Sequence, residues 1–469
     1  MRRFDSNLFC FLFHFATDVS FGPTPRAASC TLVGLQVLLS RRDDDVGRTG
    51  HVDATTASAL ASTCIVLHRK RMRNEASMTH VVKRVQWAKL DVPLRSPFAI
   101  ATTKLEGVRN VAVRVELECG TCGLGEAACL VPVTAWTQDE TLRRLKRAAP
   151  TLVGTTFDAC DWNEGIRTKT KACLVGWEAA TARAAWECAV VDAMARAHEQ
   201  PMWKSFQSKK TENGRGKVEH GLQTCITVPI DTVERGMELA KAYQGGGYVA
   251  LKIKVGRYSC DGQELDPAQA KAEGTRAGRI AAAARTMKVV VDANEAFGKN
   301  LEAAKTFLNA YQSQANELPW ILEQPMLRTE RELARQLKEW TKDAGVSIAV
   351  DEGCRTLDDA KRVVHSREAD IVNVKMAKSG LIGALDIVDL VLASGMQLML
   401  GGMVETRIGM GCAAHLATGL GCFEVVDLDT PLLLSQDPVL GGPRLENGAY
   451  WLESSGYGTD CDIMLDWQG

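Results

Sequence analysis

Eight short apolar runs, each followed by a stretch with helical spacing, occupy about 210 residues after position 217. The runs are TCITVPI, YVALKIK, KVVVDAN, WILEQP, SIAVDE, DIVNVK, QLMLGG and FEVVDLD. Apolar strands that alternate with helices are typical of parallel β/α units, in which both faces of the sheet are buried. Eight units in this length favour a closed barrel over an open sheet. We therefore expect a β/α barrel at 217–440.

The segment that precedes the barrel has a different pattern. Between residues 81 and 126, short alternating runs around a glycine turn, such as VAVRVELECGTCGLGEA, predict a small antiparallel sheet. From 137 to 208, helix formers dominate, with apolar residues three and four positions apart. These two parts predict an α+β domain at 78–216. The last residues, 441–469, are expected to pack back on this domain.

Residues 1–77 resemble neither domain. They combine the apolar stretch LFCFLFHFA, an acidic run at 43–45 and the basic HRKRMR at 68–73. The apolar stretch is short and is broken by His14, which argues against a signal peptide, and the acidic residues argue against a transit peptide. A disordered tail, an organelle-targeting segment and a start codon placed ahead of a true start at Met78 stay open as alternatives.

Composition narrows the expected partners and location. The chain has 56 Lys+Arg against 57 Asp+Glu, without the concentrated positive charge that nucleic acids or anionic membranes require. No apolar run reaches the roughly 18 residues of a membrane span. The 15 cysteines have no regular spacing, and the pair Cys119 and Cys122 lacks a second CxxC, so we expect a plain turn there and a reducing compartment. The expected location is the cytoplasm, or a plastid or other organelle if residues 1–77 are a transit peptide.

Charged residues stand at or near the last position of most of the strand-like runs. They are Lys252, Lys254, Asp292, Glu323, Asp351, Lys375, Asp427 and Asp429. One such residue often marks only the point where a strand meets solvent. In a β/α barrel, however, the C-terminal strand ends form a single rim, where active sites are built. Charges at the ends of six of the eight strand-like runs therefore predict one common site.

Three of these residues, Asp292, Glu323 and Asp351, come from successive runs. Their spacings of 31 and 28 residues each correspond to about one β/α unit. Together on the rim they would repel one another unless they share a cation. Ligands that offer only oxygen select a hard divalent ion, Mg²⁺ or Mn²⁺, over zinc.

Three lysines accompany the carboxylates. Lys252 and Lys254 are two residues apart on one strand and point to the same side, whereas Lys375 lies four strands further on, nearly opposite across the barrel. A lysine near another ammonium group and a divalent cation has its neutral form favoured and can act as a general base. Two bases could then face each other across a bound molecule.

The ordered motifs LKIKVG, VVDAN, LEQP, VDEG and NVKMAKSG resemble the enolase superfamily and, within it, the muconate-lactonizing subgroup. The resemblance covers roughly residues 79–450. It implies an α/β fold, a modified (β/α)7β TIM barrel with an N-terminal α+β capping domain. The segment DLDTPLLL at 427–434 further resembles the eighth-strand DxD segment of dipeptide epimerases of the L-Ala-D/L-Glu type, in which the two aspartates hold the α-ammonium group of the substrate.

The resemblance implies a Mg²⁺-dependent epimerisation of a small dipeptide at the α-carbon of its C-terminal residue, through an enediolate. Lys254 and Lys375 would transfer the proton on opposite faces, while Lys252 would stabilise the anion. The ion, with Mn²⁺ as an alternative to Mg²⁺, would be held by Asp292, Glu323 and Asp351.

Further residues follow from the same resemblance. Asp427 and Asp429 would bind the ammonium group, and their two-residue spacing points both carboxylates one way. Asn294 and Glu405 would support the site from behind these groups, or would serve only the fold. The remaining expected substrate contacts are Met403, Thr103 and Lys104. Thr103 stands where some Ala-Glu epimerases have an arginine that Lys104 could replace, and departures such as DEGC alter the pocket, so the preference for glutamate stays open.

Other functions are compatible with the same fold. The site also resembles those of o-succinylbenzoate synthase, N-acylamino acid racemase and muconate cycloisomerase, but their ligands offer no ammonium group to Asp427 and Asp429. The mandelate racemase branch needs a His-Asp pair, and neither His365 nor His415 ends a strand-like run. A noncatalytic binding protein would have lost a lysine or a metal ligand, and none is lost. Because relatives commonly form symmetric oligomers, a homo-oligomer is among the expected states.

Overall fold

The computed structural model describes residues 79–99, 104–131, 133–158, 162–173, 180–207, 221–256 and 264–469. The extension predicted at 1–77 and the predicted substrate contact Thr103 lie outside the described residues. In the described ranges, none of the helices has the length and apolarity needed to cross a membrane.

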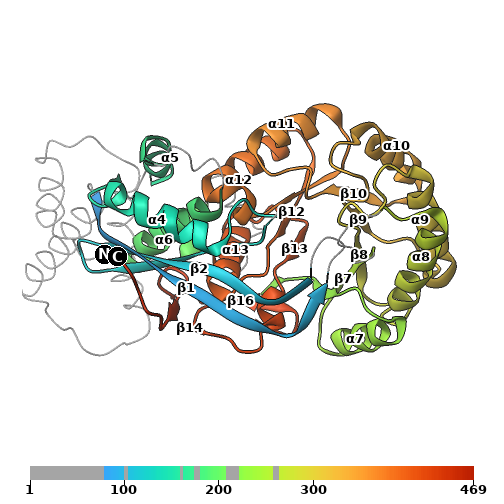
Figure 1. The fold of residues 1–469 in the computed structure, drawn as a ribbon, viewed down its shortest axis with the longest axis horizontal. Helices are drawn as coiled ribbons and strands as arrows, with labels where there is room; N and C mark the ends of the chain where they lie inside the picture. The colour runs from blue at the N-terminus through green and yellow to red at the C-terminus, as the bar shows by residue number, and fades with distance from the viewer. Residues whose placement is uncertain are drawn as a thin grey trace, which may run out of the picture. The chain divides into compact units, whose positions relative to one another are not determined.

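Long antiparallel strands begin the described chain. They are β1 (Thr79–Ala99), β2 (Lys104–Leu117), β3 (Cys122–Ala127) and the short β4 (Thr156–Asp158). The sheet order is β3-β2-β1-β4, and all neighbours are antiparallel, as predicted. The predicted turn joins β2 to β3, and its cysteines, Cys119 and Cys122, are free. The β1–β2 hairpin reaches from the helices of this part to the mouth of the barrel near β7 (Ala250–Lys254) (Figure 1).

Helices cover the sheet and leave little space between the two layers. They are α4 (Gln138–Leu152), α5 (Trp162–Cys173) and α6 (Ala180–Ala197). The 3-10 helix η1 (Met202–Phe206) follows α6 and packs against it. A Cβ atom at Gly125 of β3 would lie 1.9 Å from the carbonyl oxygen of Ala185. Glycine at this position therefore lets the largely buried helix α6 approach the strand backbone.

All eight predicted barrel strands are present and parallel in chain order. Besides β7 they are β6 (Ile226–Val228), β8 (Lys288–Asp292), β9 (Ile321–Glu323), β10 (Ser347–Val350), β11 (Ile371–Val374), β12 (Gln397–Gly401) and β13 (Val425–Asp427). The Cys225 backbone N–H donates to Val426 O at 2.8 Å, which brings the last strand beside the first. The predicted fold, a nearly closed α/β barrel with an N-terminal α+β domain, is therefore confirmed.

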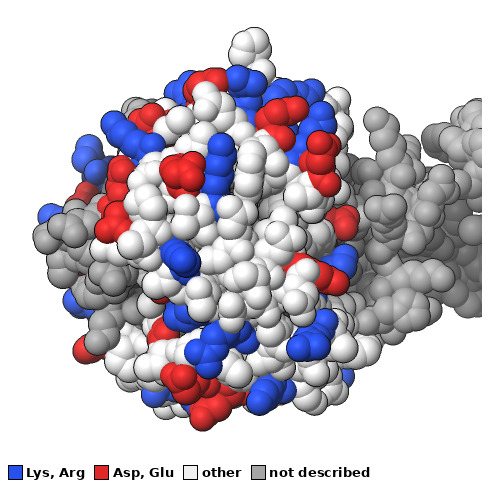
Figure 2. All heavy atoms as spheres, turned by 90° about the vertical axis from the view of Figure 1, so that its right-hand side faces the viewer, with Lys and Arg blue, Asp and Glu red and all other residues white. Residues whose placement is uncertain are grey.

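Helices surround this sheet on its outer side (Figure 1). They are α7 (Val233–Gly245), α8 (Pro267–Ala282), α9 (Leu301–Ala315), α10 (Arg331–Thr341), η3 (Lys342–Ala344), α11 (Leu357–Ser366), α12 (Met376–Ala393) and α13 (Arg407–Leu420). Capping boxes at Asp266 and Thr356 fix where α8 and α11 begin. Figure 2 shows Lys and Arg side chains interspersed with Asp and Glu over the face that lies on the right of Figure 1.

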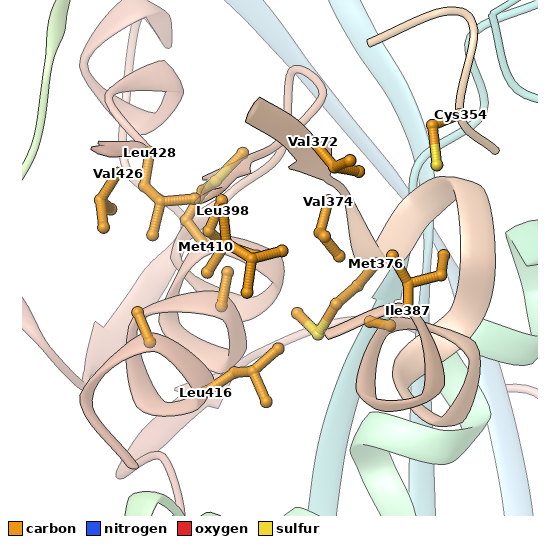
Figure 3. Packing of buried hydrophobic residues seen from close by; sticks show 14 of the residues in the cluster. Cys354, Val372, Val374, Met376, Ile387, Leu398, Met410, Leu416, Val426 and Leu428 are labelled. Atoms are coloured by element: carbon orange, nitrogen blue, oxygen red, sulfur yellow. The ribbon is translucent and has the colours of Figure 1, made fainter. Parts of the chain in front are cut away.

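Apolar side chains fill the space between the strands and the surrounding helices. In Figure 3, Val372 and Val374 of β11 lie near Met376 and Ile387 of α12, within one buried cluster. The alternate residues of the same strand face the barrel interior instead, because successive side chains of a strand point to opposite sides. Burial on both sides explains why these strands are apolar runs with few polar residues.

The C-terminal part adds short elements, some of which contact the N-terminal domain. They are η4 (Thr430–Leu433), β14 (Val439–Gly441), β15 (Arg444–Glu446), β16 (Ala449–Trp451) and β17 (Cys461–Ile463), and β16 pairs with β5 (Leu222–Gln223). Arg196 of α6 donates to Cys461 O at 2.6 Å, and the backbone of Trp87 in β1 bonds with that of Gln468. The chain end therefore lies against the sheet and helix of the N-terminal domain.

We predict that His415 makes stability depend on pH. Its ring is buried in α13, its Nδ1 accepts a hydrogen bond from Trp203 N at 3.2 Å, and burial lowers its pKa to about 3. A histidine in the unfolded chain binds a proton near pH 6.5, whereas the buried ring stays neutral at that pH. The free energy of unfolding therefore falls as the pH falls below 6.5. His415→Gln should remove about 2 kcal/mol of the loss between pH 7 and pH 5, measured by urea unfolding.

The matched control for this prediction is His365→Gln, because His365 is exposed in the last turn of α11. That variant should keep the full acid sensitivity of the wild type. Equal acid sensitivity in the His415→Gln variant and the wild type would contradict the prediction.

Candidate active site

Side chains inside the barrel lie in two layers of opposite character. The lower layer is apolar and consists of Cys225, Ala250, Val290, Ile321, Ala349, Ile371, Met399 and Val425. Two positions further along each strand, the next inward residue is polar or charged on every strand except β12, which has Gly401. These residues are Thr227, Lys252, Asp292, Glu323, Asp351, Asn373 and Asp427, all buried. The apolar layer therefore closes the barrel beneath a layer of buried charges.

Lys252 lies at the centre of the charged layer. Its Nζ atom is 2.9 Å from Asp292 Oδ2, 2.8 Å from Glu323 Oε2 and 2.7 Å from Asp427 Oδ2. Burial lowers the pKa of Lys252, but the three carboxylates more than offset this effect, and the pKa lies well above its usual value. The ammonium group thus joins β7 to three other strands of the barrel.

Lys254 is the next inward residue of β7 after Lys252, and it shares the carboxylate of Asp292 with Lys252. Its Nζ donates to Asp292 Oδ2 at 2.5 Å and to Asn294 Oδ1 at 3.2 Å. Asn294 has a positive φ of 42° and donates through Nδ2 to Glu352 Oε1 at 3.0 Å. Burial, followed by the charges of Asp351 and Asp292, raises the pKa of Glu352 to about 8. The predicted supporting residue Asn294 therefore holds Lys254 directly.

Lys375 approaches the cavity from β11. Its Nζ donates to Asp351 Oδ2 at 2.8 Å, and a second lysine, Lys378, donates to Asp351 Oδ1 at 2.6 Å and to Asp351 O at 2.7 Å. Burial raises the pKa of Asp351, but these two ammonium groups outweigh it and hold that pKa well below its usual value. A Cβ atom at Gly401 would lie 3.0 Å from Lys375 Cε, so glycine there leaves room for the lysine.

The two aspartates of the DxD segment are fixed by different donors. Asp427 Oδ2 accepts a hydrogen bond from Lys252, and Asp429 Oδ2 accepts one from Thr227 N at 2.7 Å. Asp427 Oδ1 is buried and accepts no hydrogen bond from the described residues. Burial, together with the charge of Asp427, raises the pKa of Asp429 to about 7. Asp427 thus keeps one buried acceptor oxygen that has no partner among the described residues.

These groups line a cavity of about 70 Å³ that both domains enclose. The predicted residues among its lining are Lys252, Lys254, Asn294, Asp351, Lys375, Met403, Asp427 and Asp429. The N-terminal domain adds Phe98 and Leu105 from the hairpin, and Leu130 and Val133 from the segment after β3. The backbone of Lys104 belongs to β2, whereas its side chain lies outside the described part of the structure.

Other predicted and unpredicted residues lie behind this lining. Glu405 Oε2 accepts a hydrogen bond from Met403 N at 2.9 Å, so the glutamate supports the segment that carries Met403. Asn373 donates to Glu323 Oε1 at 2.7 Å, and Gln324 Oε1 accepts from Asp351 N at 2.9 Å. We did not single out Asn373, Gln324, Glu352 or Lys378 from the sequence. The sequence did contain a signal for Asn373, because it precedes Lys375 by two residues and therefore points to the same inner side of the strand.

The donor set suits a hard divalent cation. Asp292, Glu323 and Asp351 offer buried oxygen atoms from adjacent strands. Glu323 Oε2 lies 2.8 Å from Lys252 Nζ and accepts no hydrogen bond from the part of the chain that the structure describes. In the described ranges, however, no three acidic, histidine or cysteine side chains already form a cluster that could hold a metal ion. Each of the three carboxylates is paired with a lysine ammonium group instead. The carboxylates fit the ion in chemistry and would reorient to bind it.

Comparison with protein families agrees with this arrangement. A model of the mandelate racemase/muconate lactonizing enzyme N-terminal domain matches residues 82–205, and an enolase C-terminal domain-like model matches residues 235–464. The capped barrel with charged strand ends defines a class of protein, the enolase superfamily. Within it, the chain belongs to the mandelate racemase/muconate lactonizing enzyme family.

Individual relatives narrow the comparison. An L-Ala-D/L-amino acid epimerase of Populus trichocarpa is 37% identical over 388 residues, which cover 82% of this chain and 85% of the relative. An aromatic dipeptide epimerase of Herpetosiphon aurantiacus is 32% identical and covers 82% of this chain and 99% of its own. A solved dipeptide epimerase of Enterococcus faecalis, complexed with Mg and L-Leu-L-Tyr, is 26% identical with a TM-score of 0.69, covering 81% of this chain and 99% of that one. The chain is an isomerase-class enzyme like these relatives.

Proposed function

We propose that this protein epimerises a dipeptide at the α-carbon of its C-terminal residue. The observation that carries the proposal is Asp427, a residue of the cavity lining whose buried Oδ1 accepts no hydrogen bond from the described residues. The α-ammonium group of a dipeptide would supply a hydrogen-bond donor and a charge opposite to that of the carboxylate. The Populus and Herpetosiphon relatives, both named epimerases, support this class of reaction.

Asp292, Glu323 and Asp351 are our proposed ligands for Mg²⁺, and Mn²⁺ meets the same oxygen chemistry. When bound, the ion acts as a Lewis acid toward the substrate carboxylate. The presence of Mg in the Enterococcus relative supports this assignment. The carboxylates themselves keep Lys252 and Lys254 in place, because they are the partners of both ammonium groups.

Lys254 and Lys375 are the proposed acid and base. One lysine, in its neutral form, removes the α-proton, and the electron pair of the broken C–H bond moves into the carboxylate to give the enediolate. The other lysine, as an ammonium group, donates a proton to the opposite face of the α-carbon, and the centre is inverted. Lys252 stays charged between three carboxylates and offsets the negative charge of the anion.

The described lining is more suited to an apolar than to an acidic substrate side chain. Phe98, Leu105, Leu130, Val133 and Met403 are apolar members of the cavity lining. An apolar side chain loses contact with water there without leaving a polar group unpaired. Lys104 and Thr103 stay our proposed contacts for a glutamate side chain, so L-Ala-L-Glu and L-Ala-L-Phe are the informative pair of substrates.

We predict that the protein with Mg²⁺ exchanges the α-hydrogen of the C-terminal residue of L,L-dipeptides in D₂O. Epimerisation through an anion must admit a solvent proton, so mass spectrometry should record deuterium in both epimers. Chelation of the metal with EDTA should stop the exchange, and added Mg²⁺ should restore it. Deuterium gain by N-succinylamino acids with none by any dipeptide would instead favour the N-acylamino acid racemase activity.

The two lysines should each be required for inversion. Lys254→Ala and Lys375→Ala should lower the epimerisation rate by at least about a hundredfold, because one face of the α-carbon loses its acid or base. Chiral chromatography of the product measures the rate. The control is Lys241→Ala, since Lys241 is exposed on α7 and should leave the rate unchanged. Inversion at the wild-type rate in either active-site variant would rule out the two-lysine mechanism.

Asp427→Asn should weaken the recognition of the substrate amine. Removal of one charge from a buried ion pair should raise KM for the dipeptide about tenfold or more. KM for the N-acetylated dipeptide, which has no ammonium group, should change much less. Asp343→Asn, at an exposed position of η3, is the matched control. An equal rise in KM for both substrates would show that Asp427 does not bind the amine.

A further inference from the structure

Asn110 of β2 joins the end of β3 and the segment after it to Val404, which lies in the barrel domain far along the chain. Its Nδ2 donates to Glu126 Oε1 at 2.7 Å and to Val404 O at 3.0 Å, and its Oδ1 accepts from Cys129 N at 3.1 Å. The side chain is buried, and both of its amide hydrogens and its oxygen are engaged. Two of the three partners are backbone atoms, so the amide fixes the course of the chain on both sides.

Glu126 of β3 accepts a hydrogen bond from the Asn110 amide and is itself held by donors of the barrel domain. Its carboxylate is fully enclosed and accepts from Thr406 Oγ1 at 2.6 Å, from Thr406 N and from Gly409 N at 3.1 Å. These donors form the first turn of α13, whose N-terminal backbone groups suit a negative charge. Burial raises the pKa of Glu126, and its hydrogen bonds to Thr406 and Asn110 oppose this effect. The N-terminal domain is thus joined to the barrel segment that precedes α13.

The two segments that Asn110 connects carry much of the apolar lining of the cavity. Leu130 and Val133 follow Cys129, while Met403 and Val404 follow β12. Met403 packs with Ala128 and Ala377 in a small separate cluster, against which Leu130 and Val133 also lie. We call Leu130, Val133, Met403 and Val404 the apolar wall. It belongs to two domains, and Asn110 is one bonded link between its halves.

We propose that Asn110 is a positioning residue that sets the separation of the two halves of the apolar wall, and with it the size of substrate side chain that the cavity accepts. The inference rests on the proposed function, because the wall belongs to the same cavity. Loss of the amide removes the partner of the buried Val404 O and of the partly buried Cys129 N, and the two segments then move apart or admit water. The lysines are held separately by the barrel carboxylates, so the proton-transfer groups keep their places.

The experiment compares Asn110→Ala with Gln86→Ala. Gln86 is a matched residue because it is also a buried amide on the same sheet, but its Oε1 accepts from the Arg114 side chain at 3.0 and 2.6 Å. Both variants lose the hydrogen bonds of a buried amide side chain, and of the two only Asn110 is bonded to the apolar wall. Initial rates with L-Ala-L-Ala, L-Ala-L-Val, L-Ala-L-Leu and L-Ala-L-Phe give kcat and KM for each protein, and urea unfolding gives stability.

We expect Asn110→Ala to change the KM ratio between L-Ala-L-Phe and L-Ala-L-Ala about tenfold, with kcat within about threefold of the wild type. Gln86→Ala should keep the wild-type ratio even where stability falls. The same ratio in both variants, or a fall in kcat with the ratio unchanged, would overturn the positioning role. Asn110→Ser keeps one hydroxyl group and replaces Asn110→Ala if that variant does not fold, with a smaller shift of the same ratio expected.

The experiments distinguish a failure of the proposed function from a failure of the inference about Asn110. If wild-type protein with Mg²⁺ exchanges no α-hydrogen in any dipeptide, the function and the inference both fall. If the wild type is active and the ratio is unchanged in the Asn110 variants, only the inference falls.

Discussion

The fold depends on one buried layer of paired charges inside the barrel. Lys252 contacts carboxylates from β8, β9 and β13, and Asp351 contacts two lysines that follow β11. An unpaired charge in this position would cost several kcal/mol, so each member is tolerable only because the others are present. The apolar layer two residues below keeps water away from the pairs and raises the cost of breaking any one of them. Strand register and charge pairing therefore depend on each other.

Much of this arrangement follows from two rules that act on the sequence. Eight alternating units predict a closed barrel, and closure turns the order of strands into positions around one rim. The period of two then places Lys252 and Lys254, or Asp427 and Asp429, on the same inner side. Neither rule specifies rotamers, so the pairing of carboxylates with lysines could not be foreseen. Lys378 was missed because it lies beyond the strand, where helical geometry returns it toward Asp351.

Contacts between the domains are hardest to foresee, since they join residues hundreds of positions apart without a common period. Glu187 of α6 accepts a hydrogen bond from Ile382 N in α12, close to Gly380, whose φ of 75° interrupts that helix. Glu126 likewise accepts hydrogen bonds from the backbone N–H groups of Thr406 and Gly409 at the start of α13. Both carboxylates come from the N-terminal domain, and both bind backbone N–H groups of helices that follow rim strands. The cap therefore contributes to holding the segments after β11 and β12, beyond covering the cavity.

The proposed recognition of the substrate amine depends on one oxygen atom, Oδ1 of Asp427. Asp427 is anchored through Oδ2 by Lys252, which orients the carboxylate before any ligand binds, while Oδ1 has no donor within the described ranges. A buried acceptor in this condition gains most from a charged donor, because the ammonium group replaces the lost hydration with both a hydrogen bond and an opposite charge. An acylated nitrogen offers at most a neutral N–H group, and a ligand without nitrogen offers none. A preorganised acceptor of this kind thus favours a free amine over acyl ligands and over ligands without nitrogen, and this preference does not depend on the proposed role of the lysines.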